Sequence, residues 1–191
     1  MVRVRRYSVA LRMHNSVGFM ILWLNGPFGV GKTTLARALL GAHREWAIFD
    51  PEDIGFALRQ TLETHRPVSN FQDWPVWRSL VIEALAQLDT TLQSVVIVPQ
   101  TVLNESHWLE LTQGLQDRSV HVSAFTLHVD EIEHEHRIST DAVEPGAASW
   151  RRDLRPQYAD AQHWMTERTR VIDTTRLSIE EVLELVDDAI G

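Results

Sequence analysis

The sequence predicts an α/β domain built on a five-stranded parallel sheet with helices on both faces. Short apolar runs of strand length alternate with longer segments whose apolar residues recur at helical spacing. The runs are apolar almost throughout, which is typical of parallel strands covered on both faces. The predicted strands are 20–24, 46–49, 95–98, 120–129 and 170–173.

Helices are predicted between and after these strands, each from an apolar stripe or a start signal. The first helix begins near Gly31, and Ser178 with Glu181 forms a capping box at the start of the last. Pro156 is expected to end or kink the helix that contains it. The other predicted helices cover 52–63, 75–88, 105–116, 131–138 and 150–168, and the segments 65–73 and 139–149 are expected to be loops, the second one mobile.

The length of 191 residues is enough for one domain with a substantial core. We expect this domain to span residues 20–191, with a lid at about 139–155. The segment Met1–Phe19 is basic and has no clear period, so we expect a poorly ordered extension or residues upstream of a true start at Met13 or Met20.

The composition excludes several classes of protein. An apolar content of 44% and a charged content of 23% are those of a soluble globular protein. The chain has no cysteine, which excludes disulfides and thiolate metal sites and fits a cytoplasmic location. A net charge of -8 argues against nucleic acid as a partner, and no apolar run is long enough for an integral membrane segment.

The most specific motif is a phosphate-binding loop at 26–33, which fits the pattern G-x-x-x-x-G-K-[ST] at every fixed position. Glycines let successive backbone N–H groups turn toward a polyphosphate, where a Cβ would obstruct the approach. Lys32 supplies an ammonium group for the outer phosphates, and Thr33 offers a hydroxyl to Mg²⁺.

A predicted strand precedes this loop and a predicted helix follows it, which is the arrangement that the motif requires. The helix adds free N–H groups and the positive end of its dipole. The sequence therefore predicts a nucleoside triphosphate site. The residues expected around the phosphates are Gly26, Phe28, Gly29, Val30, Gly31, Lys32, Thr33 and Thr34.

Asp50 follows the second predicted strand and should lie at the same sheet edge as the phosphate loop. A carboxylate there could accept a proton from a substrate hydroxyl or hold Mg²⁺ through water. It could equally cap the next helix, and the two roles can coexist. Glu52 and Asp53 are weaker candidates, because the helix dipole alone favours acids in a first turn.

Several polar and aromatic residues beyond Asp50 are candidates for contact with a substrate. Arg59 and Arg78 have the planar fork that suits phosphate or polar ligands, although surface arginines are commoner. Gln72 and Trp74 lie near them in the sequence, and Trp74 could line a substrate cleft. Trp77 falls on an apolar stripe, so we expect it in the core.

The third predicted strand is followed by Pro99 and Gln100, without the acid that often follows such a strand in phosphate-loop proteins. The missing carboxylate disfavours an ATPase that activates water. Gln100 and Thr101 could touch a phosphate or a substrate oxygen, and a role as simple turn residues is equally compatible with the sequence.

Arginines flank the predicted lid on both sides. A loop bordered by arginines could close over the triphosphate and neutralise charge on the transferred group. Pairing with nearby acids on a solvated helix is the alternative. We assign Arg137 to catalysis and to the phosphates, and Arg151 and Arg152 to the phosphates, with Arg155 a further candidate.

The cluster His134-Glu135-His136 does not have the spacing of a metal site. Two histidines at i and i+2 of a helix point to different sides, unlike the i, i+4 pair of H-E-x-x-H. We therefore expect no zinc there.

Together these features resemble the nucleotide-kinase-like phosphotransferases, which include shikimate, gluconate and chloramphenicol kinases. The chain is most similar to the family of tunicamycin-resistance ATP-binding proteins. The specific segment is Phe49-Asp-Pro-Glu-Asp-Ile-Gly-Phe-Ala-Leu-Arg59. The other resembling segments are 23–33, 71–72, 75–78, 97–99 with Thr101, 125–127 and 149–150.

The resemblance implies the P-loop fold of the nucleoside-monophosphate-kinase type with a lid, and ATP with Mg²⁺ as cofactors. It strengthens Asp50, Glu52, Arg59, Gln72 and Arg78 as substrate-site residues, with Asp50 and Thr33 at the metal. Asp53 and Gln100 do not match fixed family positions. The last helix is short and acidic, so it cannot be a basic membrane anchor.

Three functions remain open at this point. The first is a kinase that transfers the γ-phosphoryl group of ATP to a hydroxyl of tunicamycin or a related nucleoside-sugar. The second is an ATP-dependent protein that sequesters the drug without transfer, and the third is a kinase of another small metabolite. An acid after the second strand and a closing lid favour transfer, while the acceptor and the oligomeric state are not encoded in any motif.

Overall fold

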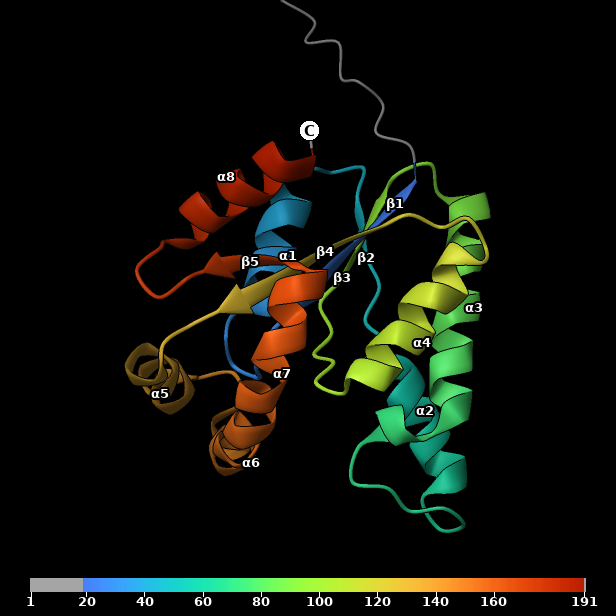
Figure 1. Ribbon diagram of the computed structural model, residues 1–191, viewed down its shortest axis with the longest axis horizontal. Coiled ribbons are helices and arrows are strands. Elements are labelled where there is room, and N and C mark those ends of the chain that lie inside the picture. Colours follow the sequence, from blue (N-terminus) through green and yellow to red (C-terminus); the bar gives the residue numbers. More distant parts are fainter. Residues whose placement is uncertain (1–18, 191) are drawn as a thin grey trace, which may run out of the picture.

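The computed structural model describes residues 19–190, and its centre is a sheet of five parallel strands. The strand order is β2-β3-β1-β4-β5, so the first strand lies in the middle of the sheet (Figure 1). This confirms the predicted α/β fold class. The strands are β1 Met20–Asn25, β2 Ala47–Ile48, β3 Val95–Val98, β4 Val122–His128 and β5 Arg170–Asp173.

Helices connect the strands and cover both faces of the sheet (Figure 1). The helices are α1 Lys32–Ala42, α2 Glu52–Leu62, α3 Pro75–Thr91, α4 Glu105–Gln116, α5 Glu131–Thr140, α6 Ala148–Asp153, α7 Arg155–Arg168 and α8 Ile179–Ile190. Two short 3₁₀ turns are η1 Phe71–Asp73 and η2 Pro145–Ala147.

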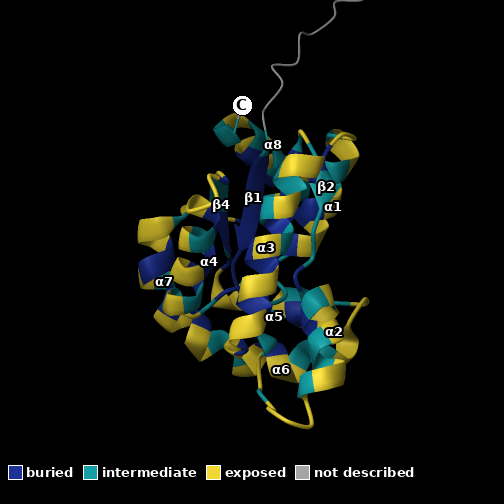
Figure 2. Cartoon of the chain, turned by 90° about the vertical axis from the view of Figure 1, so that its right-hand side faces the viewer, coloured by how far each residue is buried: buried dark blue, intermediate teal, exposed yellow. Residues whose placement is uncertain are grey.

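Strand β1 is buried along its whole length, and all six of its residues are buried (Figure 2). It pairs in parallel with β3 and with β4, where Leu22 lies opposite Ile97 and Leu24 opposite Phe125. Apolar side chains leave β1 toward both faces, so its burial needs a helical layer on each side. This explains why the run Met20–Leu24 is apolar without alternation.

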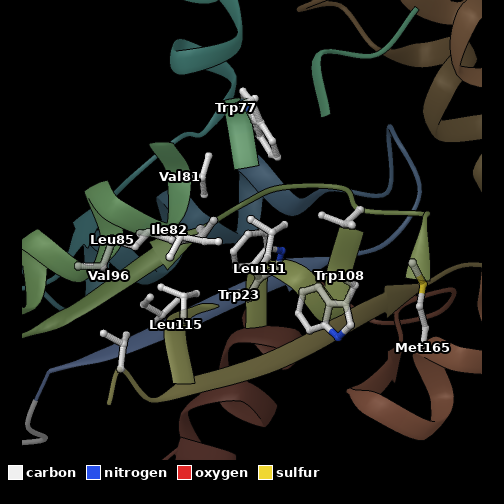
Figure 3. Close-up of a cluster of buried hydrophobic side chains, with 14 of the residues drawn as sticks. Trp23, Trp77, Val81, Ile82, Leu85, Val96, Trp108, Leu111, Leu115 and Met165 are labelled. Carbon is white, nitrogen blue, oxygen red and sulfur yellow. The ribbon is translucent and has the colours of Figure 1, made fainter. Parts of the chain in front are cut away.

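The two faces of β1 belong to two apolar clusters. Trp23 faces α3, α4 and α7, and its ring meets that of Trp108 edge to face at 5.4 Å (Figure 3). Leu22 faces α1 and α8, where it packs in the same cluster as Leu35 and Val186. The sheet is therefore the middle layer of three.

The carboxyl ends of the strands meet at one edge of the sheet, and α2, α5 and α6 extend beyond that edge (Figures 1 and 2). The segments that follow β1, β2 and β3 leave the sheet at this edge. The strand order reverses next to β1, which is where open parallel sheets form ligand crevices. The topology thus concentrates the predicted site residues at one place.

The lid region is more ordered than the predicted mobile loop at 139–149. Helix α5 continues to Thr140, the turn η2 follows, and α6 begins at Ala148. The single helix predicted over 150–168 is divided at Leu154 into α6 and α7. Pro156 explains the break, because proline is accepted in the first turn of α7 but lacks the N–H that would continue α6.

The start of the last helix is as predicted. The backbone N–H of Ser178 donates to Glu181, and the N–H of Glu181 donates to the Ser178 hydroxyl. No helix within residues 19–190 is long and apolar enough to cross a membrane. The predicted extension Met1–Phe19 lies outside the described residues except for Phe19.

The core layer of α4 offers a test of the packing. We expect Leu111→Ala to lower the free energy of unfolding by about 2–5 kcal/mol, because Leu111 is fully buried and its loss leaves a cavity. Leu109 lies on the same helix and is 41% exposed, so Leu109→Ala should cost less than about 1 kcal/mol. Urea unfolding measures both values, and equal losses would contradict this packing.

Candidate functional site

The segment between β1 and α1 has the backbone conformation of a phosphate-binding loop. Gly26, Gly29 and Gly31 have φ angles of 126°, 83° and 111°, which L side chains rarely adopt. A Cβ on Gly26 would lie 2.4 Å from the carbonyl oxygen of Leu127. Glycine is therefore required at position 26 by contact as well as by conformation. The loop also has the open surface that a polyphosphate needs, because nothing lies within 4 Å of a Cβ on Gly31.

Asn25 fixes the start of the loop, and sequence reasoning did not select it. Its side-chain oxygen accepts hydrogen bonds from the N–H groups of Gly26 and Val102, at 2.8 and 2.9 Å. Its side-chain nitrogen donates to the Val102 carbonyl at 3.0 Å. Because Asn25 is fully buried, these bonds satisfy a polar group that would otherwise destabilise the core. An amide at the end of an apolar strand was the signal that could have identified it.

Lys32 lies inside the loop and donates to the loop's own carbonyls. Its Nζ is 2.8 Å from the Pro27 oxygen and 3.2 Å from the Gly26 oxygen. The Thr101 hydroxyl donates to the same Gly26 oxygen at 2.8 Å, which connects the loop to the end of β3. Burial lowers the pKa of the Lys32 ammonium to about 7, against a smaller opposing effect of the Glu52 carboxylate.

Helix α5 holds the other side of the loop through two side chains. His134 Nε2 lies 2.8 Å from the Phe28 oxygen, and Arg137 donates to the Val30 oxygen at 2.9 Å. Arg137 also donates to the hydroxyl and carbonyl of Thr174 after β5 and pairs with Glu133 on its own helix. These contacts make Arg137 a support of the loop, and its assignment to catalysis and to the phosphates stays a prediction.

Thr33 and Thr34 follow in the first turn of α1, and both are exposed. Their hydroxyls are accessible to a ligand at the positive end of the helix dipole. Thr34 also lines a cavity of about 220 Å³ between the loop and α8. Its apolar walls are Leu127, Leu177, Ile179 and Val182, and Arg137 borders it. This cavity is a suitable place for the base of a nucleotide whose phosphates lie on the loop.

Asp50 and Glu52 form an acid pair after β2, and the Glu52 charge acts on Lys32. Asp50 is half-buried, and its carboxylate accepts a hydrogen bond from the Glu52 N–H at 3.0 Å, so it caps α2 as one alternative predicted. Burial raises the pKa of Asp50 above its ordinary value. Burial also raises the pKa of Glu52, and the Asp50 charge adds to this shift. The structure thus brings the Glu52 carboxylate within range of the loop residue Lys32, with Asp50 next to Glu52.

Arg151 lies beside the loop at Gly29. It is buried, and its side chain would lie 3.4 Å from a Cβ on Gly29. Its positive charge also contributes to the lowered pKa of Lys32. Arg151 forms ion pairs with Asp141 and Glu144 of the lid. Arg151 therefore lies next to the loop and is paired with two acids, and its assignment to the phosphates stays a prediction.

Arg152 and Arg155 instead pair with one acid on α5. Both guanidinium groups contact Glu135 at 2.6 Å, and Arg152 and Glu135 are exposed on their side chains. These hydrogen bonds lower the pKa of Glu135 to about 2. Pairing with nearby acids is the alternative to phosphate contact that the sequence left open for these arginines. The two ion pairs join α5 to α6 and α7.

An aromatic contact also joins the loop to the lid. The rings of Phe28 and Trp150 are 4.4 Å apart, and Trp150 is 49% exposed. The Lys32 ammonium lies 5.4 Å from the centre of the Phe28 ring. Phe28 thus contacts the lid with its side chain and α5 with its carbonyl.

The substrate candidates Gln72 and Arg78 form a chain of hydrogen bonds that ends at the loop. Arg78 pairs with Glu110 at 2.6 Å and donates to the Gln72 carbonyl. The Gln72 amide donates to the Thr101 carbonyl at 2.6 Å, and Thr101 contacts Gly26. These buried side chains connect α3 and η1 to the loop.

The remaining substrate candidates have different surroundings. Trp74, which by its sequence could line a substrate cleft, is buried in the core and donates to the Arg66 carbonyl at 2.8 Å. Gln100 is 1% exposed, and its amide nitrogen donates to Thr101. Arg59 lies over the Phe56 ring on its own helix, 5.9 Å from the ring centre.

The histidines of α5 do not form a metal site. His134 is buried and points to the loop, while His136 is exposed. No group of three or more histidines and acids within residues 19–190 could hold a metal ion. Any Mg²⁺ would therefore need phosphate oxygens or water in addition to Thr33 and Asp50.

Residues 21–151 match the model of a protein family described as an AAA domain. The chain belongs to this family of P-loop domains. Within it, the chain is similar to the tunicamycin resistance protein of Deinococcus radiodurans, at 31% identity over 90% of this chain and 95% of that one, with a TM-score of 0.67. No curated protein matches the chain in sequence.

Two kinases share the fold of this P-loop domain at lower identity. A gluconokinase from Sinorhizobium meliloti 1021 is 17% identical, covering 90% of this chain and 91% of that one with a TM-score of 0.61. A shikimate kinase from Bacteroides thetaiotaomicron is 14% identical, and the match covers 90% of this chain and 98% of that one with a TM-score of 0.60. At these identities the likeness concerns the fold alone, which is the P-loop kinase-like fold.

The lowered pKa of Lys32 predicts how nucleotide binding depends on pH. Phosphate contact favours the charged ammonium, so binding above pH 7 requires uptake of a proton. We expect the affinity for Mg·ATP to fall as pH rises from 7.5 to 9, by at most about tenfold per pH unit. Calorimetric titration in buffers of different ionisation enthalpy measures both the affinity and the proton uptake.

The control for this measurement is Lys32→Arg, because arginine keeps its proton throughout this range. The variant should bind Mg·ATP with an affinity that changes little between pH 7.5 and 9. A wild-type affinity that is equally flat, with no proton uptake, would contradict the lowered pKa of Lys32.

Proposed function

We propose that this protein is a small-molecule kinase that transfers the γ-phosphoryl group of ATP to a hydroxyl group. The observation that carries the proposal is the acid pair after β2: the Glu52 charge acts on the buried Lys32, and the Asp50 carboxylate lies next to Glu52 and accepts a hydrogen bond from its N–H. A protein that only binds nucleotide has no need of such a half-buried acid pair near its phosphate loop. A kinase needs a carboxylate to accept the proton of the attacking hydroxyl.

The loop residues fit ATP and Mg²⁺. The positive-φ glycines leave the backbone free to approach phosphate oxygens, and Thr33 offers an exposed hydroxyl to the metal. When bound, Mg²⁺ would neutralise phosphate charge and orient the transferred group. Lys32 would exchange its contacts with the loop carbonyls for the outer phosphates. The apolar cavity beside Thr34 would take the adenine ring.

Asp50 would act as the general base of the transfer. The acceptor oxygen forms a bond to the γ-phosphorus, the bond from that phosphorus to the bridging oxygen breaks, and the hydroxyl proton moves to the Asp50 carboxylate. Burial raises the pKa of Asp50, which makes it a better proton acceptor than an ordinary carboxylate. Arg151 would stabilise the charge of the transferred group after it leaves Asp141 and Glu144.

We propose tunicamycin or a related nucleoside-sugar as the acceptor, because the 31% identical relative is a tunicamycin resistance protein. We assign four residues to the acceptor side of the site: Glu52, Arg59, Gln72 and Arg78. The hydrogen bonds from Arg78 to Gln72 and from Gln72 to Thr101, which contacts the loop, would position the acceptor relative to Lys32. We also propose that the protein acts in the cytoplasm.

The proposal is tested by incubating the purified protein with Mg·ATP and tunicamycin and measuring the mass of the drug. Addition of one phosphoryl group, dependent on Asp50, is the expected result. Tight binding of an unmodified drug in the presence of ATP would replace the kinase with a sequestering protein. If the drug neither binds nor changes, a panel of sugars and nucleosides tests whether another hydroxyl compound is the acceptor.

Substitution of the base gives a quantitative prediction. Asp50→Asn should lower kcat/KM for the acceptor by about 10²–10⁴-fold, because the variant cannot accept a proton. Asp53 lies three residues later and is exposed, so Asp53→Asn is the matched control and should retain activity close to that of the wild type. Equal activity of the two variants would exclude Asp50 as the base.

The pH profile gives an independent check of the same residue. Asp50 works in its deprotonated form, so kcat/KM of the wild type should fall as pH decreases through the pKa of Asp50. Since burial raises that pKa, the fall should begin at higher pH than for an ordinary aspartate. The profile of Asp50→Asn should lack this acidic limb.

A further inference from the structure

His134 makes a contact with the phosphate loop that the proposed transfer does not use. Its Nε2 lies 2.8 Å from the carbonyl oxygen of Phe28, and the side chain is 4% exposed. A carbonyl oxygen only accepts hydrogen bonds, so Nε2 carries the proton in this contact. The ring is thus held as a donor toward the loop.

The charges around His134 favour the neutral ring. Burial has the largest effect and lowers the pKa of His134. The hydrogen bond to Phe28 opposes it with the next largest effect on the pKa, and the positive charges of Arg155, Lys32 and Arg137 each lower the pKa by less. A neutral ring adds no fourth positive charge to this region. The contribution of His134 is therefore a directed hydrogen bond.

The geometry of the peptide bond shows what this hydrogen bond determines. In a planar trans peptide, the C=O of one residue and the N–H of the next point in opposite directions. Holding the Phe28 carbonyl toward α5 consequently turns the Gly29 N–H away from α5. Arg137 does the same for the Val30 carbonyl and the Gly31 N–H. Gly29 and Gly31 have positive φ angles, so their N–H groups depend on such contacts for a fixed direction.

His134 and Arg137 are suited to act together because they lie one helical turn apart on the same side of α5. Their acceptors, Phe28 and Val30, are two residues apart in the loop. One rigid helix thus fixes two alternate peptide groups. Lys32 and Thr101 hold the preceding carbonyls from other elements.

We propose that His134 is a positioning residue of the phosphate loop, which directs the Gly29 N–H toward the phosphates of the nucleotide by holding the Phe28 carbonyl. The inference rests on the nucleotide-binding part of the proposed function and not on the transfer step. It also gives a role to a histidine that does not belong to a metal site.

The test compares three variants for binding of Mg·ATP and of adenosine, which has no phosphates. His134→Ala should weaken Mg·ATP binding by roughly 3- to 10-fold, the value of one hydrogen bond between neutral groups. It should leave adenosine binding within about twofold, because adenosine does not need the loop. His134→Gln should restore most of the Mg·ATP affinity, since its amide nitrogen can donate at a similar position.

His136→Ala is the matched control, because His136 lies on the same helix and is exposed. It should not change either affinity. If His134→Ala weakens both ligands equally, or if His134→Gln binds no better than His134→Ala, His134 has only a general structural role and the inference is wrong. Unchanged Mg·ATP binding in His134→Ala would also overturn it.

These outcomes are separable from those of the kinase proposal. Loss of Mg·ATP affinity in His134→Ala, together with a wild type that binds ATP but transfers no phosphoryl group, would support the positioning role and exclude the kinase. Active phosphoryl transfer by the wild type, together with unchanged Mg·ATP affinity in His134→Ala, would support the kinase and overturn the positioning role. The backbone N–H resonance of Gly29 adds a direct readout, since nucleotide should shift it in the wild type and less in His134→Ala.

Discussion

The buried amide of Asn25 is the interaction on which the arrangement of the site depends. It ends the central strand, receives the first N–H of the loop and binds both backbone groups of Val102. Through it the loop and the segment after β3 are joined at a single fully buried point. An unpaired amide at this depth would be costly, so the two segments hold each other in place.

From that point outward, the loop is supported by side chains from several elements, each directed at a backbone carbonyl. Lys32, Thr101, His134 and Arg137 leave few loop carbonyls without a donor. The carbonyls therefore face the protein, and the peptide N–H groups are free to face a ligand. Positive charge accumulates at the loop as a result, and acids of α2, α5 and the lid neutralise part of it.

The sequence was sufficient for the fold class and for the phosphate loop, because strand-length apolar runs and a spaced glycine motif are local signals. Strand order and the partners of Asn25 depend on residues more than seventy positions apart, which no local pattern encodes. The surroundings of the arginines are likewise not encoded by a local pattern. Their residue type indicated contact with phosphate, but only the fold distinguishes Arg151 beside Gly29 from Arg137 bound to Thr174. The position of Trp74 is a further example, because the sequence does not distinguish a tryptophan of the core from one that lines a cleft.

The pairing of Arg151 with two carboxylates has a consequence for the choice of ligand. Asp141 and Glu144 occupy two nitrogens of this guanidinium, so an anion that recruits Arg151 competes with two carboxylates. A single phosphate group carries no more charge than these two acids together, whereas a polyphosphate carries more and would also gain the loop amides and Lys32. The two acids therefore favour an anion of high charge over a single phosphate group as the partner of Arg151.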